Sequence, residues 1–441
     1  MLRTEWRTVP IEDLCLGIYD GPHATPKKTA DGPWFLGISS LSAGRLDLDQ
    51  SAHLSEVDYD RWTRRATPQP GDVVFSYETR LGEAAVIPDG LRCCLGRRMA
   101  LMRPDPAKVD SRFLLYAYLG PEFQATIRER TVHGSTVERI LLTEFPDFPI
   151  AVPDLETQRW IARVLGAIDD KIELNRRMNR TLESIVHAIF KSWFVDFDPV
   201  RKKMEGGEVG LPPDLAALFP NALEPSVVGP VPRDWSVSEI GKEVEAVGGS
   251  TPSTSNEDYW GGPIAFATPK DLADISAPVL LKTGRAVTAV GAAAIRSGVL
   301  EPGAVLMSSR APIGYLALNE IPACVNQGFI AMKCVHALSN HYVMQWARSN
   351  MDSIVGNANG TTFLEISKRN FRPLPVVVPP QPLVGRFTAI AESLHQQVVR
   401  SLRECEMLKS LRDALLPRLL SGELCSQDAR DPADRFSASV P

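Results

Sequence analysis

Histidine and cysteine are the residues of this chain best suited to acid–base or nucleophilic chemistry, yet they form no catalytic pattern. The seven histidines are scattered, and His187 falls in a helical pattern as an ordinary packing residue. The seven cysteines include no Cys-x-x-Cys pair, and Cys93 and Cys94 are adjacent, too close to share a metal ion. We therefore expect no metal site, and free thiols in a reducing cytoplasm.

Motifs of the common enzymatic reactions are also missing from the sequence. It contains no phosphate-binding Gly-x-x-x-x-Gly-Lys-Ser/Thr loop, no Asn-Pro dipeptide and hence no Asn-Pro-Pro-aromatic site for amino methylation. It also contains no Glu-x-Lys, Gly-x-Ser-x-Gly or His-Glu-x-x-His. These absences predict a chain that is not an enzyme and binds no cofactor, with a lone catalytic histidine as the alternative.

Paired hydrogen bonding is the chemistry that the loops do offer. Arg, Lys, Asn and Gln side chains can make bidentate contacts with the edges of DNA bases. Candidates of these types lie at Lys27, Lys28, Arg80, Arg97, Arg98, Lys270, Arg310, Asn326 and Gln327. For each of them the alternative is a solvated or structurally paired group. The net charge of −5 argues mildly against a chain that holds DNA alone, because neutralising phosphates normally requires a basic excess.

An ungapped internal repeat organises these loops. Gly134 to Pro153 returns 226 residues later as Gly360 to Pro379, with seven identical residues in twenty positions. Each copy precedes a long helical pattern. Further upstream, the β-like run Gly71–Ser76 resembles Gly303–Ser308, and Cys94–Met102 resembles Cys324–Met332. One structural unit has been duplicated, so we expect an α+β fold with two pseudo-symmetric α/β modules.

Two long helices are predicted, at about 155–194 and 382–420. Their apolar residues alternate spacings of three and four, which is the 3.5-residue period of a coiled-coil seam. Both seams have small or polar residues at matching central positions, Asn175 and Asn179 in one helix and Ser401 and Cys405 in the other. This match predicts antiparallel helices that meet at their centres, although each could instead pack only on its own module. The apolar seam residues are Ile161, Leu165, Ile168, Ile172, Leu182, Val186, Ile189, Phe387, Leu394, Val398, Leu408 and Leu415.

The boundaries follow from the repeat. We predict a first α/β module at 1–153, a helix at 154–197, a linker at 198–230 with one short helix near 215–218, and a second module at 231–379. A second helix at 380–424 and a polar, disordered tail at 425–441 complete the chain. No apolar run approaches a membrane span and the first residues resemble no signal peptide, so we expect a cytoplasmic protein without membrane contact.

Several of these motifs, in this order, resemble the specificity (S) subunit of type I restriction–modification systems. The resemblance covers some 420 residues. The residues that carry it are Gly134–Val137, Phe148–Pro153, Gln158–Ala162, Leu165–Asn175 and Phe190–Pro199 in the first half, and Trp235, Gly249–Pro252 and Asn326–Phe329 in the second. Each motif is weak alone, and their double occurrence makes the match specific.

The resemblance implies two target-recognition domains separated by an antiparallel coiled coil, each reading half of a bipartite, asymmetric site in double-stranded DNA. It implies two modification subunits that bind S-adenosylmethionine and methylate adenine, and restriction subunits that use ATP and Mg²⁺. The alternatives are the recognition subunit of a related methylase–nuclease lacking an ATP motor, and a coiled-coil scaffold that assembles proteins.

Overall fold

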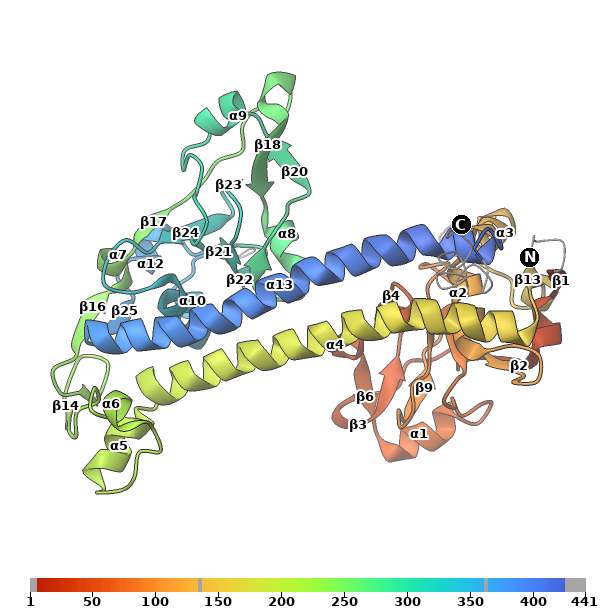
Figure 1. Ribbon diagram of the computed structural model, residues 1–441, viewed down its shortest axis with the longest axis horizontal. Coiled ribbons are helices and arrows are strands. Elements are labelled where there is room, and N and C mark those ends of the chain that lie inside the picture. Colours follow the sequence, from red (N-terminus) through yellow and green to blue (C-terminus); the bar gives the residue numbers. More distant parts are fainter. Residues whose placement is uncertain (1–5, 134–136, 361–363, 425–441) are drawn as a thin grey trace, which may run out of the picture. The chain divides into compact units, whose positions relative to one another are not determined.

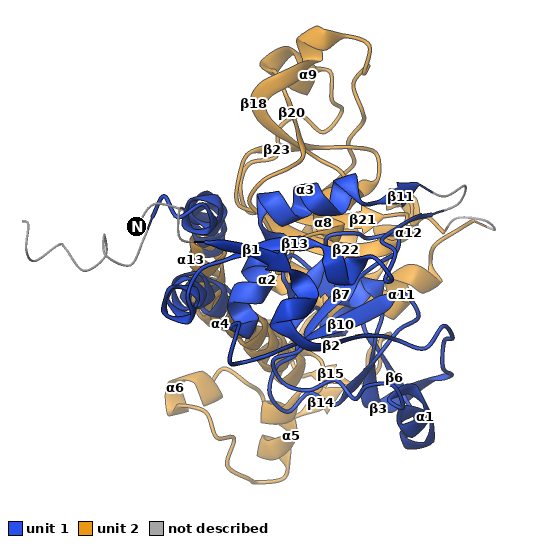
Figure 2. Cartoon of the chain, turned by 90° about the vertical axis from the view of Figure 1, so that its right-hand side faces the viewer, with its two compact units in different colours: residues 1–172, 405–441 blue, residues 173–404 orange. Residues whose placement is uncertain are grey.

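The computed structural model describes residues 6–133, 137–360 and 364–424. The predicted tail and the motif residues Gly134–Thr136 lie outside these ranges. The chain divides into two compact units, residues 1–172 with 405–441 (unit 1) and residues 173–404 (unit 2), shown in different colours in Figure 2. Both units combine β-sheets with helices. The divisions after residue 172 and after residue 404 fall inside the two long helices, so each long helix contributes to both units.

Unit 1 is built around a four-stranded antiparallel sheet with the order β2-β10-β7-β8. A second sheet has the order β6-β3-β9, in which β3 and β9 run parallel, and β1 pairs with β13. The strands are β1 (Arg7–Pro10), β2 (Cys15–Asp20), β3 (Lys28–Leu36), β4 (Leu41–Ser42), β5 (Arg45–Leu46), β6 (Ala52–Leu54), β7 (Val73–Ser76), β8 (Ala84–Val86), β9 (Cys93–Leu95), β10 (Met99–Pro104), β11 (Val132–His133), β12 (Glu138–Arg139) and β13 (Pro149–Val152), and the helices are α1 (Glu56–Trp62), α2 (Ser111–Leu119) and α3 (Pro121–Glu129).

Strand β7 lies at the centre of this sheet because all its side chains are apolar or small. Val73 and Phe75 point to the core beneath α2, while Val74 packs into a separate core on the opposite face. This alternation is expected for a strand that is covered on both sides. Helix α2 begins where the Asp110 carboxylate accepts a hydrogen bond from the Phe113 amide at 3.0 Å.

Unit 2 repeats this plan. Its main sheet has the order β17-β24-β21-β22-β19, its second sheet the order β20-β18-β23, and β16 pairs with β25. The strands are β14 (Leu223–Glu224), β15 (Val231–Pro232), β16 (Ser236–Glu239), β17 (Glu245–Val247), β18 (Trp260–Ala267), β19 (Val279–Leu280), β20 (Arg285–Val287), β21 (Val305–Ser309), β22 (Ile313–Asn319), β23 (Ala323–Val325), β24 (Phe329–Lys333) and β25 (Pro375–Val378), and the helices are α5 (Asp198–Met204), α6 (Pro213–Ala216), α7 (Ile240–Glu243), α8 (Pro269–Ala273), α9 (Ala289–Ala293), α10 (Asn340–Ser349), α11 (Met351–Gly356) and α12 (Lys368–Phe371).

The shared strand pairings confirm that the repeat is structural. Arg7 pairs with Val152 in unit 1, and Ser236 pairs with Val378, 226 residues after Val152, in unit 2. In both units the parallel pair of the second sheet, β3 with β9 and β18 with β23, leads into a short turn and an antiparallel strand of the main sheet. The predicted fold class, two pseudo-symmetric α/β modules joined to long helices, is therefore confirmed.

The two long helices are uninterrupted, as Figure 1 shows: α4 spans Leu155–Phe194 and α13 spans Gln381–Leu420, 40 residues each. The Asp154 carboxylate caps α4 by accepting hydrogen bonds from the amides of Glu156 and Thr157, bonds that lower its pKa. The predicted helices at 155–194 and 382–420 agree with these bounds.

Within each unit the helix pair runs antiparallel, as predicted. In unit 1 the Cys405 thiol lies 3.9 Å from the Ile172 carbonyl, and Arg412 pairs with Asp169 at 3.0 Å. In unit 2 Leu182 packs against Val398 and Val399, while the rings of Phe190 and Phe387 are 5.7 Å apart. Rising numbers on α4 meet falling numbers on α13 in both units.

The prediction for the linker is wrong in one respect. It expected one short helix near 215–218, whereas this segment holds α5, α6 and β14, which pairs with β15 just after the segment. The reason is long-range: Phe197, Val200 and Phe219 are all buried in the main core of unit 2, which fixes the surrounding backbone. The polar composition of the segment conceals these three anchors.

Candidate nucleic-acid interface

The turn between β9 and β10 carries two of the predicted base-reading residues of unit 1. Arg98 is committed to the protein, because its guanidinium pairs with Glu78 at 2.8 Å and donates to the Thr79 hydroxyl at 3.1 Å. Arg97 is exposed, and its carbonyl accepts a hydrogen bond from the Tyr77 hydroxyl at 2.7 Å. The backbone of the turn is therefore held while the Arg97 side chain faces solvent.

An open groove of about 590 Å³ adjoins Arg97. Its walls mix donors and acceptors: Arg97 and Arg139 supply guanidinium groups, and Asp20 and Glu78 supply carboxylates. Burial, followed by the charge of Asp20, raises the pKa of Tyr77 to about 12, so its hydroxyl stays protonated and donates. Both carboxylates are already paired, Glu78 with Arg98 and Asp20 with Arg65, so Arg97 and Arg139 are the groups of this groove that could contact a base such as guanine.

The remaining candidates of unit 1 differ in whether their side chains bind other groups of the protein. Arg80 donates to the Ile38 carbonyl at 3.2 Å and pairs with Glu83 at 3.3 Å, which ties it to the neighbouring loop. Lys27 and Lys28 are exposed at the start of β3. The structure does not bring these two lysines together with Arg97 in the groove.

Unit 2 places Asn326 and Gln327 in the equivalent turn between β23 and β24. Asn326 Oδ1 accepts from the Gly328 amide at 2.8 Å, and Gln327 Oε1 accepts from the Thr251 hydroxyl at 2.8 Å. Gln327 is exposed, and its amide nitrogen remains a donor. Helix α8, which bears the exposed Lys270, begins beside this turn, since a Cβ on Gly328 would lie 2.9 Å from the Pro269 side chain.

A glycine supports the β9–β10 turn of unit 1 and the β23–β24 turn of unit 2. A Cβ added to Gly249 would lie 1.6 Å from the Val325 carbonyl oxygen, and one added to Gly21 would lie 2.4 Å from the Gly96 carbonyl oxygen. Only glycine permits so close an approach between the incoming loop and the turn. The predicted motif Gly249–Pro252 thus includes a glycine that the turn requires.

Arg310 is paired rather than free. Its guanidinium lies 3.6 Å from the Glu365 carboxylate, and the backbones of the two residues form an isolated β-bridge. Unit 1 has the corresponding bridge between Glu78 and Arg139. Sequence reasoning missed Glu78 and Arg139, although Arg139 and Glu365 are 226 residues apart and so occupy one position of the repeat.

The predicted seam residues are all buried or half-buried, Ile161 and Leu165 within the main core of unit 1 and Phe387 within that of unit 2. Three of the four small or polar seam residues lie in unit 2, where the Asn175 amide donates to Glu404 at 2.7 Å. Asn179 and Ser401 are also buried, and their side-chain polar atoms have no hydrogen-bond partner among the described residues. Buried polar groups at a seam favour one register over its alternatives.

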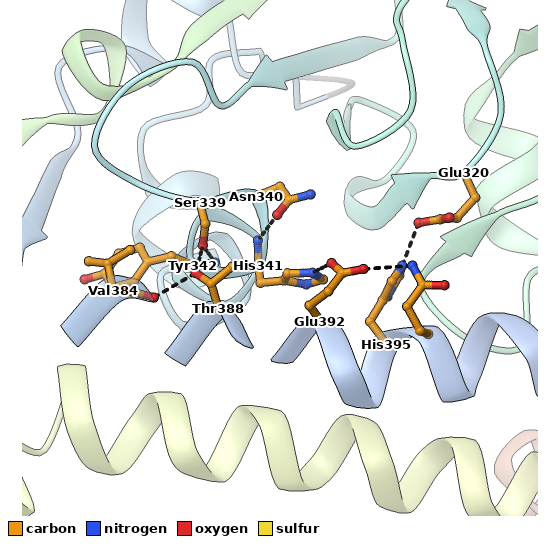
Figure 3. A network of polar contacts seen from close by, with 10 residues as sticks. Glu320, Ser339, Asn340, His341, Tyr342, Val384, Thr388, Glu392 and His395 are labelled. Carbon is orange, nitrogen blue, oxygen red and sulfur yellow. Dashed lines mark hydrogen bonds and ion pairs between the residues drawn. The ribbon is translucent and has the colours of Figure 1, made fainter. Parts of the chain in front are cut away.

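A histidine–carboxylate network attaches α10 and the main sheet of unit 2 to α13 (Figure 3). His341 Nε2 lies 2.6 Å from Glu392, and His395 Nε2 lies 2.8 Å from Glu320. Burial lowers the pKa of His341, outweighing the opposing effect of Glu392. His187, predicted as a packing residue, is half-buried and hydrogen-bonds Gln345 at 3.0 Å. These groups serve structure, as expected of histidines that line no large cavity.

Metal and membrane features can be assessed only over the part of the chain that the structure describes. Within it, no three His, Cys, Asp or Glu side chains are placed to hold a metal ion. The six cysteines in those ranges form no disulfide, and most of them are buried. Among the described helices, none has a stretch long and apolar enough to span a membrane.

The sequences of both modules match a known family. The family model described as "Type I restriction modification DNA specificity domain" matches residues 44–184 and 232–395, one copy for each module. The chain belongs to this family. Among curated relatives, the HindI specificity subunit of Haemophilus influenzae is 26% identical over 333 residues, covering 66% of this chain and 72% of that protein. The MjaIX specificity subunit of Methanocaldococcus jannaschii is 22% identical, covering 92% and 87%.

A solved structure supports the fold assignment for this specificity-domain chain. The crystal structure of a type I restriction–modification S subunit from M. genitalium superposes with a TM-score of 0.55 at 16% identity, covering 94% of this chain and 96% of that one. At this identity the likeness concerns the fold alone. The resemblance that the sequence predicts is therefore confirmed for the family and for the architecture.

Proposed function

We propose that this chain is the non-catalytic specificity subunit of a type I restriction–modification complex, and that each unit reads one half of a bipartite DNA site. The family match supports a role in DNA sequence specificity. S-adenosylmethionine, ATP and Mg²⁺ are expected on modification and restriction partners. The chain supplies base recognition and the spacing between the two half-sites.

One observation carries the proposal: the two units share a backbone frame but present different side chains from it. The turn that holds Arg97 and Arg98 in unit 1 holds Asn326 and Gln327 in unit 2. The bridge next to it is Glu78–Arg139 in one unit and Arg310–Glu365 in the other. Two readers of one kind that carry different donors and acceptors fit two different half-sites.

A partner surface is available on α4. Leu174, Met178 and Ile185 are exposed and lie on one side of the helix, separated by four and seven residues. This stripe lies away from the seam residues Ile172, Asn175 and Asn179, which are buried. We propose that a modification subunit covers this stripe, since exposed apolar residues at helical spacing are typical of protein interfaces.

The direct test is to co-express the chain with its modification partner and to map the methylated adenines. We expect methylation confined to a two-part, non-palindromic motif with a fixed spacer. Methylation independent of sequence would contradict a recognition role and would favour the scaffold alternative.

A second test concerns the helices as a spacer. Seven residues inserted after Asn175 and seven before Glu404 keep the antiparallel seam in register, because these two side chains are hydrogen-bonded. The helices then lengthen by about 10 Å, the length of roughly three base pairs. We expect the methylated motif to keep both half-sites and to gain about three base pairs between them. An active complex with an unchanged spacer would contradict the proposed spacing role.

A further inference from the structure

A lysine of unit 2, Lys368, occupies a position that in unit 1 lines the open groove beside Arg97. The 226-residue repeat aligns Lys368 with Leu142, and Leu142 is one of the residues that line that groove. Lys368 is half-buried and is the first residue of α12. Unit 2 therefore has a cation where the wall of the groove in unit 1 is apolar.

The ammonium group of Lys368 lies beside the β23–β24 turn. A Cβ added to Gly248 would lie 3.3 Å from Lys368 Nζ and 3.3 Å from the carbonyl oxygen of Phe329. Gly248 immediately precedes Gly249, which supports the turn, and Phe329 is the first residue of β24 after the turn. Lys368 thus places its charge next to the turn that carries Gln327.

Unit 1 has a different charge arrangement at this place. The register of β2 on β10 and of β17 on β24 aligns Asp20 of unit 1 with Gly248 of unit 2. The Asp20 carboxylate pairs with the Arg65 guanidinium, so the two charges cancel. Glycine offers no carboxylate at the corresponding position of unit 2, and the charge of Lys368 is not cancelled in this way.

The other charged groups near the β23–β24 turn also favour an anion. The Arg296 amide donates to the Ser250 hydroxyl at 3.1 Å, which places this exposed arginine next to the loop that contacts the turn. The carboxylate of Glu365, the acidic residue nearest to Lys368 in the sequence, pairs with Arg310 at 3.6 Å. Local cations in a chain of net charge −5 match the phosphodiester backbone of DNA.

We propose that Lys368 binds a backbone phosphate of the half-site that unit 2 reads. This inference rests on the proposed function and assigns Lys368 to affinity rather than to base recognition. A lysine has three donors and no fixed plane, so it binds phosphate as a point charge, whereas the side-chain amide of Gln327 can make paired contacts with a base. Phosphate contacts fix the position of a protein on the duplex. Leu142 offers no such contact in unit 1, so the two half-sites are held unequally.

The salt dependence of DNA binding by the complete methyltransferase complex tests the proposal. Each phosphate that a protein neutralises contributes about −0.9 to the slope of log K against log salt concentration. Lys368→Met should therefore make the slope less steep by roughly one and weaken binding to all sequences to a similar extent, with the methylated motif unchanged. Lys368→Arg keeps the charge and should keep the slope. An unchanged slope in Lys368→Met, or a motif relaxed at one base pair, would overturn the phosphate contact.

Lys333→Met is the matched control, because Lys333 lies on β24 of the same unit and pairs with Glu245 at 3.4 Å. This variant should keep the slope of the parent, and a loss equal to that of Lys368→Met would show that the effect is not specific to Lys368. A parent complex that methylates without a motif would refute the proposed function together with this inference. A motif-specific parent whose slope does not depend on Lys368 would refute this inference alone.

Discussion

Units 1 and 2 build the same bridge beside the same strand with the charges exchanged. Glu78 bridges Arg139 in unit 1, and Arg310 bridges Glu365 in unit 2. In both units the residue before the first partner accepts a backbone hydrogen bond from an isoleucine of the repeated motif, Ile140 at 2.9 Å or Ile366 at 3.0 Å. The backbone frame is therefore set by buried strands and main-chain bonds, so the charges displayed on it can change without refolding.

The strongest test of this comparison removes the glycine that each frame requires. Gly249→Ala should destabilise unit 2 by on the order of 3 kcal/mol, since a Cβ would meet a backbone oxygen that cannot move aside. Gly21→Ala should cost unit 1 less, about 1–2 kcal/mol, because the approach is wider. Urea unfolding of the two variants measures the difference. Equal losses would show that the turns are supported differently from what the geometry indicates.

A second prediction separates what the two turns read. Arg97→Ala should relax the methylated motif in one half-site only, and Gln327→Ala in the other half-site only. Each lost bidentate contact should cost about 1–3 kcal/mol of discrimination between bases. Sequencing of methylated adenines in cells that carry each variant gives the measurement, with Arg92→Ala as the control because Arg92 is paired with Glu56 and is not among the base-contact candidates. Relaxation of both half-sites by either variant would contradict separate readers.

Local sequence patterns predicted the helices and strands whose apolar pattern is clear within the element itself. The bounds of α4 followed from a seam of period 3.5 sustained for 40 residues, which few other structures can satisfy. The β7 and β21 strands followed from apolar runs after a glycine. Helix α5 did not follow from any local pattern, because burial of Phe197 and Val200 depends on Trp235, 35 or more residues away.

The candidate interface was predictable only in part, for the same reason. The turn residues Arg97 and Gln327 stand out by type and position. The bridge between Glu78 and Arg139 joins residues 61 positions apart, and no local pattern signals it. The commitment of Arg98 and Arg310 to ion pairs is likewise a tertiary property. Which residues contact bases stays a prediction.

The helix pairs of the two units also differ, and this difference gives the third prediction. Unit 1 has an apolar layer of Ile168, Ile172 and Cys405, whereas unit 2 buries Asn179 without a hydrogen-bond partner among the described residues. Asn179→Leu should therefore stabilise the chain by about 1 kcal/mol. Ile168→Leu, a change of shape within the apolar layer, should cost less than about 1.5 kcal/mol. Denaturant midpoints compare the two, and a destabilised Asn179→Leu variant would indicate that the amide is satisfied.

The smallest expected effect concerns the contacts that attach α2 of unit 1 and α10 of unit 2 to the long helices. In unit 1, α2 is attached to α4 through Arg112 and Asp170, with two hydrogen bonds of 2.8 and 2.9 Å that raise the pKa of the arginine further. In unit 2, α10 is attached to α13 through His341 and Glu392. An arginine–aspartate pair keeps its charges throughout the neutral range, whereas a histidine can change its charge there. Only the attachment in unit 2 should respond to mild acid.

The direction of that response follows from the lowered pKa of His341. Its folded form resists protonation, so its contribution to stability is complete above the ordinary histidine pKa and is lost as pH falls through that value. The pKa of Glu392 is also lowered, because hydrogen bonds from His341 and Gln396 outweigh its burial, and this adds a loss in the same direction at lower pH. Between about pH 7 and pH 5.5 the Tm should fall by about 2 °C more in the parent than in His341→Gln. The exposed His336→Gln variant of unit 2 should behave as the parent, and an identical acid dependence in all three proteins would remove His341 as its source.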